Sequence, residues 1–205
     1  MRRLPFSFVA FLALAAPAIL AAGPIVIDFE GLPDSTIITN QYLGVTFSNA
    51  IILTAGISLN EFEFPPFSGS NVASDNGGPL SIAFASPATT FAGYFTHTVP
   101  LTLRAFNLAN TQVALIPSLF SDNLALSGDL GSHPNEFLQL SFAGGFSRVT
   151  ITGDSAGGAF VLDDAALTSA VPEPSPLSLA FVGVAFLLGV RRVFVRGSRA
   201  WKLSR

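Results

Sequence analysis

Short runs in which apolar and polar residues alternate fill the middle of the chain at a spacing of roughly ten residues. The first run covers residues 25–29 and is followed by the turn residues of segment 31–34. Alternation with a period of two buries one face of a β-strand, and no run shows the 3.6-residue period of an amphipathic helix. The candidate strands are 25–29, 44–48, 51–54, 80–85, 89–96, 101–106, 113–116, 137–142, 148–152 and 159–162.

These strands predict an all-β protein, an antiparallel β-sandwich of the jelly-roll type. The composition agrees, with 18 Gly, 14 Pro and 20 Phe among 205 residues. The jelly roll is preferred because the first and the last strand both end beside acidic residues and are expected to be neighbours. The core is expected to be mainly aromatic. Its predicted members are Phe29, Phe47, Phe84, Phe91, Phe95, Phe142, Phe160 and Leu162.

Two long segments lack a strand pattern. Residues 56–79 hold Pro, Gly, Ser and Asn clusters and predict either a binding loop or a mobile connection. Residues 117–135 mix Ser, Asp, Gly and Leu without a clear period. The Gly144-Gly145 pair and the glycine-rich segment 153–158 are expected to form hairpin turns between strands.

Charge is distributed unevenly along the chain. All 13 acids lie from Asp28 to Glu173, an interval whose only basic residues are Arg104 and Arg148, so its net charge is −11. Nucleic-acid phosphates require lysines and arginines, and an acidic body therefore excludes nucleic acid as a partner. The chain has no cysteine, which excludes disulfides, thiolate chemistry and cysteine-based metal centres.

Four acids lie at the two ends of the predicted sandwich: Asp28 and Glu30, and Asp163 and Asp164. Pairing of the terminal strands gathers these carboxylates at one edge, and calcium prefers several hard oxygen ligands. They are candidate ligands for a structural calcium ion. The competing interpretation makes them strand-end caps and acceptors in turns. Strict alternation would place Asp163 and Asp164 on opposite faces of their strand.

No set of catalytic residues stands out. Paired carboxylates serve glycosidases, but no spacing in this chain selects such a pair, so a polysaccharide hydrolase is only a minor alternative. His97 and His133 match no metalloenzyme pattern and are interpreted as surface residues, and no Gly-x-Ser-x-Gly elbow is present. Tyr42, Tyr94 and exposed phenylalanines are candidates for stacking on sugar rings. The protein is interpreted as non-enzymatic.

The amino end has the pattern of a secretory signal peptide. Arg2 and Arg3 precede an apolar stretch over residues 4–20, and small residues follow. The signal peptide is assigned to residues 1–22, with cleavage after Ala18 or after Ala22. The alternative is an uncleaved membrane anchor.

The carboxyl end also has the pattern of a membrane segment. An apolar run covers residues 177–190, and Arg191 and Arg192 follow as a basic stop. The run is short for a full span, which needs about 20 residues, so the transmembrane helix is placed at about 176–195. The positive-inside rule keeps the basic tail in the cytoplasm and the acidic body outside. The predicted sandwich, residues 24–169, is thus flanked by a signal helix and a transmembrane helix.

A short motif precedes this membrane segment: Val171, Pro172, Glu173 and Pro174. The motif, a glycine-containing apolar segment and a closing arginine cluster, in this order, resemble the PEP-CTERM sorting signal of Gram-negative bacteria. The match covers residues 170–205, although the tail after Arg192 is longer than is usual in the family. The body resembles the β-sandwich ectodomains found with this signal, through residues 28–33, 42–48 and 160–164.

The resemblance implies a route and a partner. Exosortase, a membrane protease-transpeptidase, recognises the motif of such proteins and removes the tail. The expected precursor is tethered to the inner membrane, and the expected product reaches the cell surface or the extracellular, biofilm matrix. The resemblance implies no enzymatic activity. The alternative function is a carbohydrate-binding module of the extracellular polysaccharide.

Overall fold

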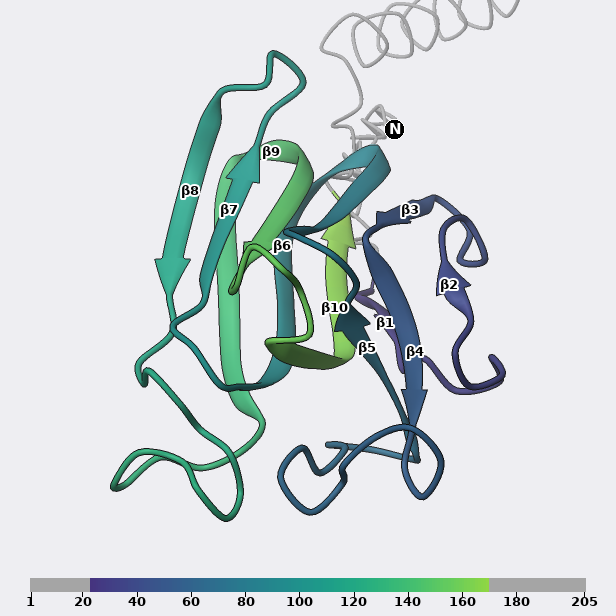
Figure 1. Ribbon diagram of the computed structural model, residues 1–205. Helices are drawn as coiled ribbons and strands as arrows, with labels where there is room; N and C mark the ends of the chain where they lie inside the picture. Colours follow the sequence, from purple (N-terminus) through teal and green to yellow (C-terminus); the bar gives the residue numbers. More distant parts are fainter. Residues whose placement is uncertain (1–22, 170–205) are drawn as a thin grey trace, which may run out of the picture. The chain divides into compact units, whose positions relative to one another are not determined.

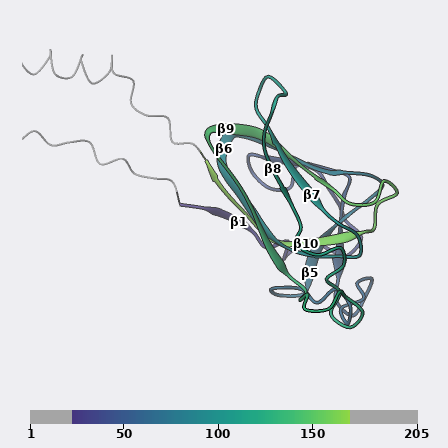
Figure 2. The same cartoon turned by 90° about the vertical axis from the view of Figure 1, so that its left-hand side faces the viewer.

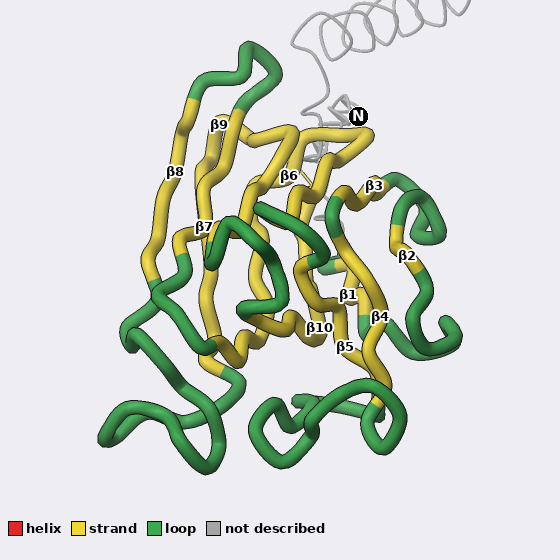
Figure 3. Tube along the Cα trace, in the orientation of Figure 1, coloured by secondary structure: helices red, strands yellow, loops and turns green. Residues whose placement is uncertain are grey.

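Ten β-strands make up the regular structure of residues 23–169, which are the residues that the computed structural model describes (Figures 1 and 3). No helix occurs among these residues. The strands are β1 Ile25–Ile27, β2 Ile37–Ile38, β3 Val45–Ser48, β4 Ala50–Thr54, β5 Asn71–Asp75, β6 Leu80–His97, β7 Thr102–Phe106, β8 Gln112–Pro117, β9 Glu136–Thr152 and β10 Phe160–Ser169.

The strands pair in the order β2-β4-β5-β10-β6-β9-β7-β8, and β1 and β3 add to β10 and β6. Every pair of these strands is antiparallel. The all-β, antiparallel architecture predicted from the sequence is therefore confirmed. Ile25 of β1 pairs with Leu167 of β10, so the first and last strands are neighbours, as expected.

The sheet bends so that it forms two layers. Strands β6 and β9 are long and run through both layers (Figure 2). The first part of β6 pairs with β3 and with the end of β9, whereas its last part pairs with β10 and the start of β9. The pairing shifts register between Ala83 and Ala88, where the strands bend. The sequence predicted two strands in each of these segments. The turn-forming residues between the predicted strands cause a bend within one continuous strand and not a reversal of the chain.

Gly145 lies at this bend inside β9, so the hairpin predicted at Gly144-Gly145 is wrong. Its φ is +76°, and a Cβ atom at this position would lie 3.1 Å from the Cβ of Pro87. Glycine is needed because the backbone is left-handed and because a neighbouring strand segment approaches closely.

Strand β5, Asn71–Asp75, lies where the sequence predicted a loop. All five residues are buried between β4 and β10. The polar side chains are satisfied inside: the Ser74 hydroxyl donates to the carbonyl of Phe160 at 3.0 Å, and Asp75 Oδ1 accepts the N–H of Ala159 at 2.9 Å. Polar residues form a central strand here because the neighbouring backbone supplies their partners.

One main hydrophobic core lies between the layers. It contains every predicted core residue except Phe142, which is 37% exposed. Residues 141–144 of β9 are all exposed before the bend, and the chain then buries Phe146 completely. The period-two pattern fails at Phe142 because the strand leaves the layer there.

The predicted signal peptide and the sorting segment lie outside the described residues. This holds for residues 1–22, for Val171, Pro172, Glu173 and Pro174, and for Arg191 and Arg192. Within residues 23–169 no helix has the length and apolar character needed to cross a membrane.

Candidate functional site

A bulge in β10 determines how the acids near the end of the domain are used. Asp164 has a φ of +44°, and the pairing with β6 shifts between Asp163 and Ala166. Asp163 Oδ2 accepts the N–H groups of Phe67 at 2.8 Å and of Ser68 at 2.9 Å, and Asp164 Oδ1 accepts the Ser68 hydroxyl at 3.0 Å. The extra residue of the bulge brings both carboxylates to one loop, so the expected placement on opposite faces is wrong.

Glu30, which follows β1, holds the end of the same loop. Its Oε1 atom accepts the N–H groups of Ser70 at 2.8 Å and of Asn71 at 2.7 Å. Gly69 has a φ of +55°, and a Cβ atom there would lie 2.3 Å from Glu30 Oε1. Asp28 Oδ1 instead accepts the N–H of Glu30 at 3.2 Å. Glycine at position 69 lets the carboxylate reach the backbone.

The structure thus brings three of the four candidate calcium ligands, Glu30, Asp163 and Asp164, to one loop. Their carboxylate oxygens accept hydrogen bonds from backbone N–H groups and from a hydroxyl. Over residues 23–169 no three His, Asp or Glu side chains are grouped so as to hold a metal ion. Calcium binding stays a prediction from the sequence.

The loop between β4 and β5 folds over the outer face of the sheet. Leu59 packs with Val72 of β5 and Val161 of β10 in a second buried apolar cluster, to which Phe64 adds. Together with the carboxylate contacts, this cluster fastens the loop to the face of β5 and β10. Of the two predictions for residues 56–79, these contacts favour a fixed loop over a mobile connection.

The fastened loop places Phe67 on Tyr94 of β6. The two rings are stacked, with centroids 3.4 Å apart and planes 8° apart. Tyr94 pairs with Asp163 on one side and with Phe137 of β9 on the other. The Tyr94 and Phe137 rings lie 5.3 Å apart at an angle of 53°. Phe67, Tyr94 and Phe137 form a continuous set, the aromatic row, on the outer face of the sheet.

The aromatic row is open to solvent. Phe67 is 46% exposed and Phe137 is 53% exposed, while Tyr94 is partly buried beneath Phe67. Gln139 and Ser141 follow Phe137 on the same face of β9, and the Gln139 amide donates to the Ser141 hydroxyl at 3.1 Å. Flat apolar rings beside amide and hydroxyl groups suit a ligand that has both apolar faces and hydroxyl groups.

Tyr94 was a candidate for sugar stacking in the sequence, but the two phenylalanines were not singled out. Phe67 lies in a loop and Phe137 at a strand start, and neither position reveals exposure. Tyr42 packs against the core in T-shaped contacts with Phe29 and Phe47, with ring centroids 6.0 Å apart in each pair. Burial, and next the charges of nearby acids, raise the pKa of Tyr42 to about 12. Tyr42 is therefore a packing residue.

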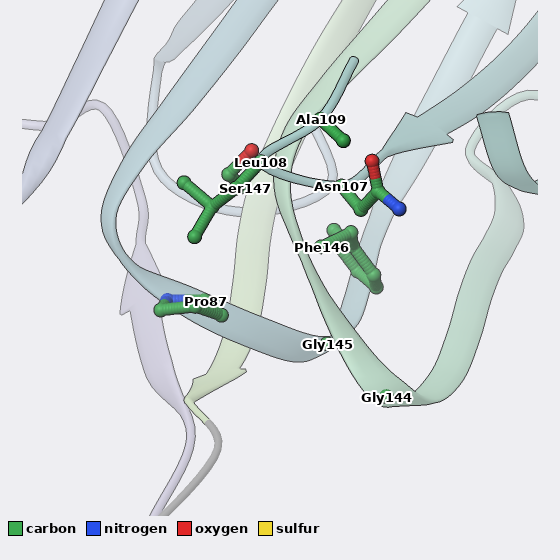
Figure 4. Close-up of a pocket in the computed structure, with 8 residues that line it drawn as sticks. All are labelled: Pro87, Asn107, Leu108, Ala109, Gly144, Gly145, Phe146 and Ser147. Atoms are coloured by element: carbon green, nitrogen blue, oxygen red, sulfur yellow. The ribbon is translucent and has the colours of Figure 1, made fainter. Parts of the chain in front are cut away.

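Two pockets on the described residues are lined by no Asp, Glu, His, Lys or Arg side chain. One, of about 300 Å³, lies between the β7–β8 turn and the bend of β9 (Figure 4). Another, of about 390 Å³, adjoins Tyr42 and Phe84. The first is lined by Pro87, Asn107, Leu108, Ala109, Gly144, Gly145, Phe146 and Ser147.

His97 is fully buried, so its prediction as a surface residue is wrong, whereas His133 is exposed. His97 Nε2 lies 3.2 Å from Glu136 Oε2, and Glu136 Oε1 accepts the N–H of Leu119 at 2.7 Å. Asn123 Oδ1 accepts the N–H of His97 at 2.7 Å. These contacts fasten the loop between β8 and β9 and leave the imidazole no access to a substrate.

No family model and no curated protein matches the chain. Solved structures similar to it include the K2 cleaved adhesin domain of Lys-gingipain, with 14% identity over 71% of this chain and 99% of that domain and a TM-score of 0.45. A DUF4465 family protein from Bacteroides caccae has 10% identity over 73% and 100% of the two chains and a TM-score of 0.46. The family 11 carbohydrate-binding module of a cellulosomal cellulase from Clostridium thermocellum has 10% identity over 75% and 98% and a TM-score of 0.33. With TM-scores below 0.5, these similarities assign neither a family nor a ligand.

Proposed function

We propose that residues 24–169 form a non-enzymatic, jelly-roll-like carbohydrate-binding module that holds a neutral polysaccharide on the aromatic row. The observation that carries this proposal is the stacked pair of Phe67 and Tyr94, which continues into Phe137 across an exposed sheet face. A sugar ring has an apolar face of C–H groups and a rim of hydroxyls. The aromatic rings pack against the first, and Gln139 and Ser141 hydrogen-bond the second.

Charge favours a neutral glycan at this site. The two arginines, which are the only Arg or Lys residues between 23 and 169, lie on other strands, β7 and the end of β9. The acid beside the aromatic row is Asp163, which pairs with Tyr94. A carboxylate or sulfate on the ligand would meet negative charge without a compensating cation.

The contacts of the acids support binding without catalysis. A glycosidase needs an acid and a base or nucleophile that face the scissile bond. Asp163 beside the aromatic row is 1% exposed, and both of its oxygens accept backbone N–H groups. A carboxylate committed in this way holds the loop and does not face a ligand.

The binding experiment uses affinity electrophoresis of the full chain against neutral β-glucans, xylans and mannans. Phe67→Ala and Phe137→Ala are each expected to weaken retardation on the glycan that binds by roughly 3- to 10-fold, which is the worth of one aromatic contact. Phe62→Ala is the matched control, because Phe62 is 71% exposed on the same loop but outside the row. Equal losses in all three variants, or no retardation by any neutral glycan, would overturn the proposal.

We further propose that the chain is exported and that exosortase processes it at Val171–Pro174, delivering the module to the surface or matrix of a Gram-negative cell. The support is the order of motif, apolar segment and arginines in the sequence. Because β1 pairs with β10, the described domain begins and ends at one place, away from the long loops (Figure 1). A module joined to the membrane at that end leaves its loop end free for polysaccharide.

A further inference from the structure

Arg104 and Arg148 lie close together on the outer face of the layer that contains β7 and the end of β9. Arg104 of β7 pairs with Thr150 of β9, and Phe106 pairs with Arg148, so the two arginines are diagonal neighbours on adjacent strands. Both side chains face away from the core, because the residues that alternate with the arginine positions along each strand are buried. Those buried residues are Leu103, Ala105, Val149 and Ile151.

Neither guanidinium has an acidic partner within residues 23–169, where the only side-chain ion pair joins His97 and Glu136. Arg148 is nevertheless held in place: its Cζ lies 4.4 Å from the Phe106 ring centroid, and it donates to Asn110 Oδ1. A guanidinium has five N–H donors, so most of them stay available for a ligand. A charged group that is fixed but unpaired is suited to bind an anion.

The strand residues that share a face with the arginines include hydroxyl side chains and no Asp or Glu. The register of β3, β6, β7 and β9 determines which side chains lie on this outer face. The hydroxyl residues of this face are Thr46, Ser48, Ser81, Thr102, Thr150 and Thr152. We name Arg104, Arg148, Phe106 and these hydroxyl residues the arginine face.

We propose that the arginine face binds an acidic polysaccharide through its carboxylates. The planar fork of a guanidinium fits a carboxylate with two parallel hydrogen bonds, and the threonine and serine hydroxyls suit the sugar hydroxyls. Charge complementarity is local: the domain carries a net −10 from two arginines and twelve acids over residues 23–169, but this face is positive. Two cations are too few for the phosphates of a nucleic acid. The site is separate from the aromatic row and does not depend on it.

The test compares polygalacturonate with its methyl ester, which has the same backbone without charge, in affinity electrophoresis of the full chain. Polygalacturonate is expected to retard the protein, the fully esterified polymer not to, and rising salt to weaken the effect. Arg104→Gln and Arg148→Gln are each expected to reduce the affinity at least about fivefold, since each removes one charge-assisted contact.

Two controls separate this inference from the proposed function. Phe137→Ala is expected to leave polygalacturonate binding unchanged, and the arginine variants are expected to keep the wild-type melting temperature and circular dichroism spectrum. Equal binding of the acid and its ester would overturn the inference, as would arginine variants that are folded and bind as tightly as the wild type. Binding of polygalacturonate lost only in Phe137→Ala would place it on the aromatic row and equally overturn the inference.

Discussion

The carboxylate of Asp163 accepts the backbone N–H of Phe67 at 2.8 Å, across 96 residues of sequence. The same carboxylate oxygen also accepts the N–H of Ser68. Together these two bonds hold the loop so that the Phe67 ring stacks on Tyr94. A buried acid of the last strand therefore decides the position of an exposed aromatic ring in a distant loop. Loop anchoring and ligand binding are expected to fail together when the acid is removed.

Asp163→Ala is expected to lower the free energy of unfolding by about 1–3 kcal/mol, because the N–H groups of Phe67 and Ser68 lose their acceptor. It is also expected to weaken neutral glycan binding as much as Phe67→Ala does. Urea unfolding and affinity electrophoresis measure the two effects. Asp154→Ala is the control: its carboxylate accepts the Ala156 N–H in an exposed turn, so this variant should lose less stability and keep full glycan binding. If the Asp163→Ala protein is destabilised but binds the glycan with full affinity, Asp163 does not position Phe67 for binding.

Stability is expected to depend on pH through Asp163. Burial, and to a smaller extent the charge of Asp164, raise the pKa of Asp163 from 3.8 to about 6. Between these two values the folded state binds more protons than the unfolded state, so the free energy of unfolding falls as pH rises through this window. Burial raises the pKa of Asp75 as well, which acts in the same direction.

Asp163→Asn isolates the contribution of Asp163. Urea midpoints measured in steps of about one pH unit from pH 4 to 7 are expected to fall less steeply in this variant than in the wild type. The other acids titrate in both proteins and cancel in the comparison. Parallel curves for the two proteins would show that Asp163 does not titrate in this range.

Gly69→Ala is expected to destabilise the protein more than Gly131→Ala. Both glycines have a left-handed φ, +55° and +84°, but a Cβ atom at Gly131 meets nothing within 4 Å, whereas at Gly69 it meets Glu30. The control carries only the backbone strain, about 1–2 kcal/mol. Gly69→Ala adds displacement of the Glu30 carboxylate from Ser70. Equal melting temperatures of the two variants would contradict the role given to Glu30.

Processing at the carboxyl end is expected to require the sorting motif. Intact-mass analysis of the mature protein should show loss of the tail in the wild type and retention of the tail in Pro172→Ala and Glu173→Ala. The two substitutions lie outside residues 23–169, so the fold of the described domain serves as a control. Normal processing of both variants would argue against recognition of this motif by exosortase, whereas an intact tail in the mature wild-type protein would favour a plain membrane anchor.

The calcium hypothesis predicts a higher melting temperature in about 1 mM calcium, the range of extracellular sites, than in chelator. Glu30→Gln and Asp163→Asn are expected to abolish the difference, because each removes a charged ligand. Equal wild-type melting temperatures in calcium and in chelator would leave the backbone amides as the partners of these carboxylates.

Features encoded by neighbouring residues were readable from the sequence. Alternation predicted most strands because burial of one strand face is a local, period-two property. The acidic residues beside the first and last strands correctly placed these strands side by side. Strand β5 was missed because Asn71 and Asp75 look polar in isolation, and only their partners in the fold make burial favourable.

The sequence by itself determined an all-β, antiparallel chain whose terminal strands pair, since strand formation depends on the local pattern. Only the tertiary structure decided that the bulge at Asp164 turns two acids to one loop, that Phe67 lies on Tyr94, and that Arg104 and Arg148 share a face without an acid. These relationships join residues far apart in the chain. Their physical cause is the register and bending of the sheet, which no single segment encodes.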